Sequence, residues 1–372
     1  MKFHTYSDEM ITYKQIRIAV PSMIIGVGVL SLPRGIASAT LGADGWIPLV
    51  ITGAMQMIII YLMAKLASNF PKQTFLSYAS KLVSKPVATI LTLLFALFFI
   101  GVAAYDIRML GHTSEQYLFT NTPVEVVTLT FLLVVIYAVA GSRAAIFRLN
   151  MVFLPIILIV LLVVLLLSFK FINFSNVLPV FETDLKGYWN GIRTSALSYI
   201  GVSIILFYTA FVDKPKKVPK AAAIGMCIPI IVYILVYVIC ILVFGQLATS
   251  HLLFPTVDLA KRVDLSGGIL ERMEAIFFTV WTLGVFTTAV MSFDMVILAL
   301  QSIFRKMKKI HLVFILSPIM YYISMVPKNT NQIVVYGDYL ATYLYIYGYI
   351  VTIGLIIIAK VRKGKSNEKR NR

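Results

Sequence analysis

Few residues of this chain have both a side chain suited to catalysis or metal binding and a suitable spacing from a second such residue. The four histidines are too scattered for a metal site or a catalytic pair: His4, His112, His251 and His311. Cys227 and Cys240 lie in one long apolar run, where packing explains them better than a disulfide does. No nucleophile stands beside a candidate base. We therefore predict no enzyme, no cofactor and no metal.

One carboxylate is predicted to lie inside a membrane span, where a charged group has a high free energy. Asp294 is the acidic residue that we expect well inside an apolar run, about 16 Å of helix before the basic group at Arg305. A carboxylate at that depth must be neutral, paired or in contact with water. Two interpretations stay open: a proton-relay or ion-coupling group, or a buried acid that is bonded to a neighbour or faces an inner vestibule.

A glycine pair interrupts the first apolar run. Ile25-Gly26-Val27-Gly28 is followed by Pro33, and against Ala in a helix interior Gly costs about 1 kcal/mol and Pro about 3. In lipid, a broken helix leaves backbone groups unpaired unless protein or a water-filled cavity covers them. A break at mid-membrane depth therefore points to a binding site. The alternative is a kinked or closely packed helix without a ligand.

The elements that position these residues are membrane helices. Of the 372 residues 59% are hydrophobic and 13% are charged, and the apolar residues fall in long uncharged runs. The net charge of +17 resides mainly in short loops between those runs, which is a membrane-topology signal and gives no reason to expect nucleic acid. The expected partner of the surface is thus the lipid bilayer.

Ten segments are long enough to span a bilayer core. They are predicted at 12–37, 44–67, 84–111, 123–141, 145–169, 188–212, 219–246, 269–304, 310–327 and 333–360. With the N-terminus in the cytoplasm, most Lys and Arg fall inside and most Asp and Glu outside, so both termini are predicted to be cytoplasmic. Residues 361–372 form a basic cytoplasmic tail, and the loop 247–268 is expected to be a partly helical cover over the outer face.

The ten spans divide into two halves that run in opposite directions. The sixth span repeats the Ile-Gly-Val of the first, and interruptions at matching positions of inverted halves are typical of transporters. N–H groups at a half-helix N-terminus favour a carboxylate, while free carbonyls at a half-helix C-terminus favour an ammonium, so the pair suits an amino acid zwitterion. The predicted substrate-binding residues of the two breaks are Ile25, Gly26, Val27, Gly28, Tyr199, Ile200, Gly201 and Val202.

The stretch Ile25-Gly26-Val27-Gly28-Val29-Leu30-Ser31-Leu32-Pro33-Arg34, followed by Gly45-Trp46, resembles the spore germination permease family. These proteins are the B subunits of germinant receptors, within the amino acid–polyamine–organocation superfamily. The resemblance covers residues 13 to 360, and the basic loop Val212-Asp213-Lys214-Pro215 fits it as well. Many relatives carry a Gly-Phe-Glu-like triplet at the sixth-span break, whereas this chain has Gly201-Val202-Ser203 and no carboxylate.

The resemblance implies a ten-helix, five-plus-five inverted-repeat fold and recognition of a small germinant together with A and C subunits in the spore inner membrane. Thr287 and Thr288 match the place where superfamily members put hydroxyls on a sodium ion, so they join Asp294 as ion-coupling candidates. The alternative for both is a hydrogen bond to their own helix.

Three further residues are candidates near the site. Phe98 and Tyr105 are expected in an aromatic wall of the pocket, with plain packing as the alternative. Arg34, placed just past a break at Pro33, is a gate candidate or an interface anchor. Asp106 and Arg108 are expected near the outer interface, where they pair with other chains or snorkel.

We therefore predict an all-α integral membrane protein with the leucine-transporter-like fold. It forms one transmembrane domain over residues 1–372, with repeat one at about 12–169 and repeat two at about 188–360. The expected function is that of a germinant receptor B subunit that binds a small germinant, with a small neutral or apolar amino acid as the expected ligand. An active amino acid transporter coupled to a proton or sodium ion is the alternative.

Overall fold

The computed structural model describes the chain except residues 1–8, 119–120, 264–272, 344–347 and 371–372, and except the side chains of 363–372. The described chain is helical, and its one β-type contact is a bridge between Ile11 and Val212. The longer helices are α2 (Tyr13–Ile24), α3 (Gly28–Ala37), α4 (Trp46–Ser68), α5 (Phe75–Leu82), α6 (Lys85–Tyr117), α7 (Val124–Ala140), α8 (Arg143–Ser168), α9 (Leu185–Ser195), α11 (Val218–Phe244), α13 (Pro255–Arg262), α14 (Met273–Ile303), α15 (Lys309–Met325), α16 (Thr330–Tyr343) and α17 (Ile350–Arg370).

These helices supply the expected membrane spans. Within the described ranges, five helices are long and apolar enough to cross a bilayer, and two bent helix pairs raise the number to seven. The shorter apolar helices α7 and α15 occupy two more of the predicted positions. The last predicted span, 333–360, corresponds to α16 and α17, with 344–347 outside the described residues.

The first span is broken, though not where the proline stands. Helices α2 and α3 meet at 55° around Ile25–Val27, whereas Pro33 lies inside α3. The expectation of a break at Pro33 was wrong because a neighbour replaces the missing bond. Proline cannot donate to the carbonyl four residues earlier, and the Thr256 hydroxyl of α13 donates to that carbonyl, on Val29, at 2.7 Å.

The sixth span is broken as well. Helix α9 continues through the 3₁₀ turn η3 (Ala196–Tyr199), and the chain resumes at η4 (Val202–Ile204), α10 (Ile205–Tyr208) and η5 (Thr209–Phe211). The two parts are bent by 48°. Gly201 stands at the break with φ of +110°, a left-handed conformation that Gly adopts without steric cost.

The third span is longer than predicted. Helix α6 runs on to Tyr117 rather than ending near residue 111. Asp106 therefore lies 11 residues inside the helix end, which at 1.5 Å per residue is about 16 Å. The expectation that Asp106 lies near the outer interface was wrong, because the polar residues after it continue the helix instead of leaving it.

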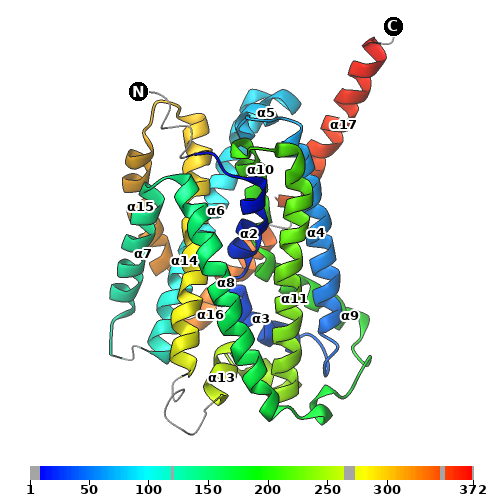
Figure 1. Cartoon of the computed structure of the whole chain (residues 1–372), viewed down its shortest axis with the longest axis vertical. Helices are drawn as coiled ribbons and strands as arrows, with labels where there is room; N and C mark the ends of the chain where they lie inside the picture. The colour runs from blue at the N-terminus through cyan, green and yellow to red at the C-terminus, as the bar shows by residue number, and fades with distance from the viewer. Residues whose placement is uncertain (1–8, 119–120, 264–272, 344–347, 371–372) are drawn as a thin grey trace.

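The broken spans lie among the long helices. Helix α2 contacts α8, α11 and α14, while α6 packs along α14 and α4 along α11. Helix α2 begins and α17 ends at the same end of the bundle, and α13 lies at the opposite end (Figure 1). The predicted cover at 247–268 contains α12 (Gln246–His251) and α13, and its last residues fall outside the described ones.

A buried carboxylate ties the two halves together at the end of the bundle where α13 lies. Asp44, in the loop between α3 and α4, accepts hydrogen bonds from the backbone N–H of Phe181 at 2.6 Å and of Thr183 at 3.0 Å. Burial alone would raise the pKa of Asp44, but these bonds and those from the Thr183 and Tyr188 hydroxyls lower it below its usual value. The loop that leads into α9 is thereby fixed to the loop that follows α3.

Candidate functional site

Close backbone approach explains both glycines of the first break. A Cβ added to Gly26 would lie 2.8 Å from Cγ2 of Thr288, on α14. A Cβ added to Gly28 would lie 2.9 Å from the Tyr233 hydroxyl and 3.0 Å from the Ser198 Cα. These separations leave no room for a larger residue without movement of the neighbours. The first break is thus held directly against α11, α14 and the second break.

The second break contacts the first through Gly201. A Cβ at Gly201 would lie 2.5 Å from Cγ of Met23, which is on α2. Ser198, three residues earlier, lies against Gly28, since a Cβ added to Gly28 would be 3.0 Å from the Ser198 Cα. The two interruptions are therefore adjacent in space, although 175 positions separate Gly26 from Gly201.

Where the helices are broken, several backbone carbonyls have no intrahelical donor. Side chains from neighbouring helices contact these carbonyls instead. Trp281 Nε1 donates to Gly26 O at 2.9 Å. The Tyr233 hydroxyl lies 2.7 Å from Ile24 O and 2.9 Å from Ser198 O. Because unpaired backbone groups in lipid cost several kcal/mol each, these contacts explain how the breaks persist inside the bundle.

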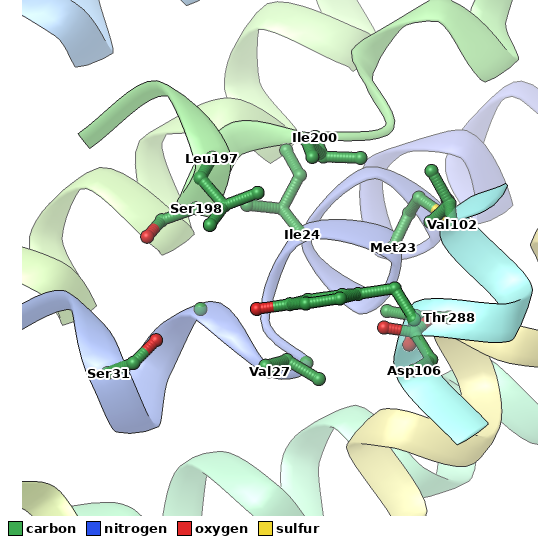
Figure 2. A pocket seen from close by; sticks show the side chains of 13 residues that line it. Met23, Ile24, Val27, Ser31, Val102, Asp106, Leu197, Ser198, Ile200 and Thr288 are labelled. Atoms are coloured by element: carbon green, nitrogen blue, oxygen red, sulfur yellow. The ribbon is translucent and has the colours of Figure 1, made fainter. Parts of the chain in front are cut away.

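A small cavity lies between the breaks and α6 (Figure 2). It has a volume of about 30 Å³, which accommodates roughly two water molecules. The cavity is too small for an amino acid in this arrangement of the two breaks. Six of the predicted site residues line the cavity: Gly26, Val27, Gly28, Tyr105, Ile200 and Thr288.

Other predicted residues lie outside the cavity lining. Phe98 stacks on Tyr343 with ring centroids 5.6 Å apart, as expected for a packing residue. Tyr199 packs edge-on against Tyr233 at 5.2 Å. Ile25 faces a separate apolar space next to Trp281.

Three more of the predicted residues lie in the second break or at the end of α3. Gly201 and Val202 are buried and form the second break itself. Arg34 is half-buried in the last turn of α3. No contact that the structure provides assigns Arg34 to a gate.

Asp294 is paired rather than free. Its carboxylate accepts two hydrogen bonds from Arg143, from Nε at 2.9 Å and from Nη2 at 3.2 Å, and a third from the Tyr208 hydroxyl at 3.1 Å. Arg143 also pairs with Glu9. The predicted spans 123–141 and 145–169 left Arg143 in the connection between them, whereas it is the first residue of α8 and is 2% exposed. The geometry favours a paired buried acid over an ion-coupling group.

The two threonines of α14 bond to backbone carbonyls. The Thr287 hydroxyl lies 2.8 Å from Gly284 O and 3.1 Å from Ser22 O. The Thr288 hydroxyl lies 2.9 Å from Val285 O. Each therefore has an acceptor on its own helix, which is the alternative left open by the sequence. Within the described ranges, no three His, Cys, Asp or Glu side chains come together as a metal site.

The sequence reasoning missed three polar residues of the cavity lining, of which Asp106 is the charged one. Asp106 lines the cavity next to Thr288 and is 4% exposed (Figure 2). The available signal was its position in an uninterrupted helical pattern that carries on to Tyr117. Ser31 and Ser198 add hydroxyls to a lining that is otherwise mostly apolar.

Two solved structures share this architecture. MhsT in complex with L-phenylalanine aligns with a TM-score of 0.70 at 13% identity, over 94% of this chain and 98% of that one. Mhp1, a nucleobase-cation-symport-1 family transporter in a closed conformation, aligns with a TM-score of 0.67 at 14% identity, over 91% and 76%. At such identities the likeness concerns the fold alone. The prediction of an all-α, inverted-repeat membrane fold is confirmed.

The family follows from the sequence comparison. Residues 10–333 match the family model described as "Spore germination protein", so the chain belongs to that family. It is 39% identical to spore germination protein GerLB of Bacillus cereus, over 92% of each chain. It is 29% identical to spore germination protein YndE of Bacillus subtilis (strain 168), over 95% of this chain and 97% of that one. The resemblance inferred from the first-span motif is confirmed, and the chain is a permease-like, multi-pass membrane protein.

Proposed function

We propose that this chain is the B subunit of a germinant receptor and binds a small amino acid at mid-membrane depth. The observation that carries the proposal is the cavity lined jointly by Gly26–Gly28 and Ile200. The N-terminus of α3 begins at Gly28, and the first N–H groups of a helix lack intrahelical acceptors. They favour the carboxylate of the ligand. Family membership supports germination as the process in which the site acts.

Signalling requires that the ligand distinguish two states of the protein. The closed cavity is too small for an amino acid, so a bound ligand favours a wider arrangement of the two breaks. We propose that this widening is passed to A and C subunits in the spore inner membrane. In this proposal both termini are cytoplasmic, and the two repeats, at about 12–169 and 188–360, form one transmembrane domain.

Active transport is the second candidate. The shared fold with MhsT and Mhp1 favours it, because alternating access uses the same broken helices. A transporter coupled to a proton or sodium ion would carry the amino acid across the bilayer. A receptor subunit only needs to bind it.

Substitution of Gly28 tests the proposed site. Gly28→Ala places a methyl group 2.9 Å from the Tyr233 hydroxyl and 3.0 Å from backbone at Ser198, so the breaks must move. Gly354→Ala is the matched control, since a Cβ there meets nothing within 4 Å. Spores of a deletion strain that carry each variant are exposed to graded amino acid concentrations, and membrane levels of the protein are compared by immunoblot.

We expect Gly28→Ala to change the amino acid concentration for half-maximal germination at least tenfold, with Gly354→Ala unchanged. Equal potency for both variants would contradict the mid-membrane site. Uptake of labelled amino acid by proteoliposomes separates the two functions. Robust uptake by the isolated chain, together with normal germination in the deletion strain, would establish the transporter instead.

A further inference from the structure

Asp106 is the one charged side chain among the residues that line the cavity. It is 4% exposed, and among the described residues nothing donates a hydrogen bond to its Oδ2. The Thr288 hydroxyl lies next to the carboxylate at the cavity, and its hydrogen bond goes to Val285 O. A carboxylate inside a membrane protein is costly unless it is paired or neutral.

No cation of the described chain compensates this carboxylate. Arg143 forms its ion pairs with Glu9 and Asp294, not with Asp106. Arg108 follows two positions later on α6, and residues so spaced do not face each other. The aromatic hydroxyl that approaches from α16, on Tyr336, donates to Gly101 O instead. The free oxygen of Asp106 is thus available to a group that enters the cavity.

Protein donors already contact several backbone carbonyls at the breaks. Trp281 Nε1 donates to Gly26 O, and the single hydroxyl hydrogen of Tyr233 is shared between Ile24 O and Ser198 O. These contacts use part of the accepting capacity of the carbonyls that an ammonium group between the breaks would meet. Asp106 Oδ2 is a buried carboxyl oxygen with no donor in place.

We propose that Asp106 binds the ammonium group of the ligand, which makes a positively charged amino group a requirement for recognition at this site. The inference rests on the proposed function and deepens it. The ligand carboxylate goes to the N-terminus of α3, and its ammonium goes to α6. The ligand class is then α-amino acids with a free amino group, while carboxylic acids without one are excluded.

The test uses the full chain in lipid nanodiscs and three probes of one shape: L-valine, isovalerate, which lacks the amino group, and isobutylamine, which lacks the carboxylate. The readout is tryptophan fluorescence, because Trp281 bonds directly to Gly26 O at the break. Asp106→Asn removes the charge at nearly constant shape, and Asp106→Glu retains it. Asp338→Asn, on α16 and outside the cavity lining, is the carboxylate control.

We expect Asp106→Asn to weaken L-valine and isobutylamine about 10- to 100-fold, the usual range for a lost charge-assisted hydrogen bond. The same variant binds isovalerate as well as the wild type does or better, which shows that it is folded. Asp106→Glu keeps the preference for amines, and Asp338→Asn behaves as the wild type.

Two results would overturn the role of Asp106, and a third, distinguishable from them, would overturn the proposed amino acid site. If the wild type binds L-valine and Asp106→Asn binds it equally well, Asp106 does not contact the ammonium and the proposed function stands. A difference between the two only in the pH dependence of affinity would assign a proton to Asp106 and likewise reject the inference. If L-alanine, L-valine and L-leucine all fail to bind the wild type, the proposed amino acid site itself falls.

Discussion

The buried pair of Arg143 and Asp294 allows a sharp energetic prediction. Its members join α8 to α14 through two hydrogen bonds of 2.9 and 3.2 Å, and both side chains are almost completely buried. The guanidinium also lies 4.4 Å from the ring centroid of Phe211, at the end of η5 in the sixth span. The pair therefore connects three parts of the bundle.

Removal of one partner is expected to be much worse than removal of both. Arg143→Met strands the Asp294 carboxylate with only the Tyr208 hydroxyl, which should cost about 3–5 kcal/mol in the free energy of unfolding. The double variant Arg143→Met/Asp294→Leu buries no charge, so we expect it to recover most of that loss. The coupling free energy of the cycle is expected at about 2–3 kcal/mol.

Equilibrium unfolding of the full chain in detergent micelles measures these differences. Arg148→Met is the matched control, because Arg148 is exposed on the same helix. It should change the free energy of unfolding by less than about 0.5 kcal/mol. The reasoning is refuted if Arg143→Met differs from Arg148→Met by less than about 1 kcal/mol, or if the double variant is as unstable as the sum of its parts.

Three other predictions follow from contacts at the breaks and the outer loops. Gly201→Ala forces a side chain into φ of +110° and toward Met23, which should cost about 1–3 kcal/mol and lower the melting temperature, while Gly354→Ala leaves it unchanged. Thr256→Val leaves the Val29 carbonyl without its donor and should cost about 1–3 kcal/mol in the same assay; an unchanged melting temperature would reject this role. The lowered pKa of Asp44 means that its stabilising effect is complete above the unfolded pKa of about 3.9 and is lost as pH falls through the folded value. The melting temperature of the wild type should therefore drop more between pH 5 and about pH 2.5 than that of Asp44→Asn, and parallel curves would contradict the assignment.

Local signals predicted the breaks well. Gly26 and Gly28 marked the interruption of the first span, and Gly201 marked that of the sixth, because glycine is poor helix material wherever it occurs. Pro33 gave a misleading signal. Its cost was relieved by Thr256, a residue that lies far away in the sequence and could not be paired with Val29 beforehand.

The polar residues of the site were harder to predict. Asp294 was recognised as a buried acid that needs a partner, but the predicted spans left that partner, Arg143, in the connection between residues 141 and 145. Asp106 was assigned to the outer interface because the predicted third span stopped short of Tyr117. An error of a few residues in the predicted end of the third span changes the expected position of Asp106 from the membrane surface to the cavity. The predicted role of Asp106 therefore depended on where that helix was taken to end.

The sequence by itself determined the membrane-spanning helical class, the family and the two broken spans, since hydrophobic length, loop charge and glycine preference act over short stretches of chain. Only the tertiary structure decided which groups face each other. It brought Arg143 to Asp294 across 151 positions and Trp281 to Gly26 O across 255, and it left Asp106 facing the cavity. Such pairings depend on how long helices pack side by side, and no local pattern encodes them.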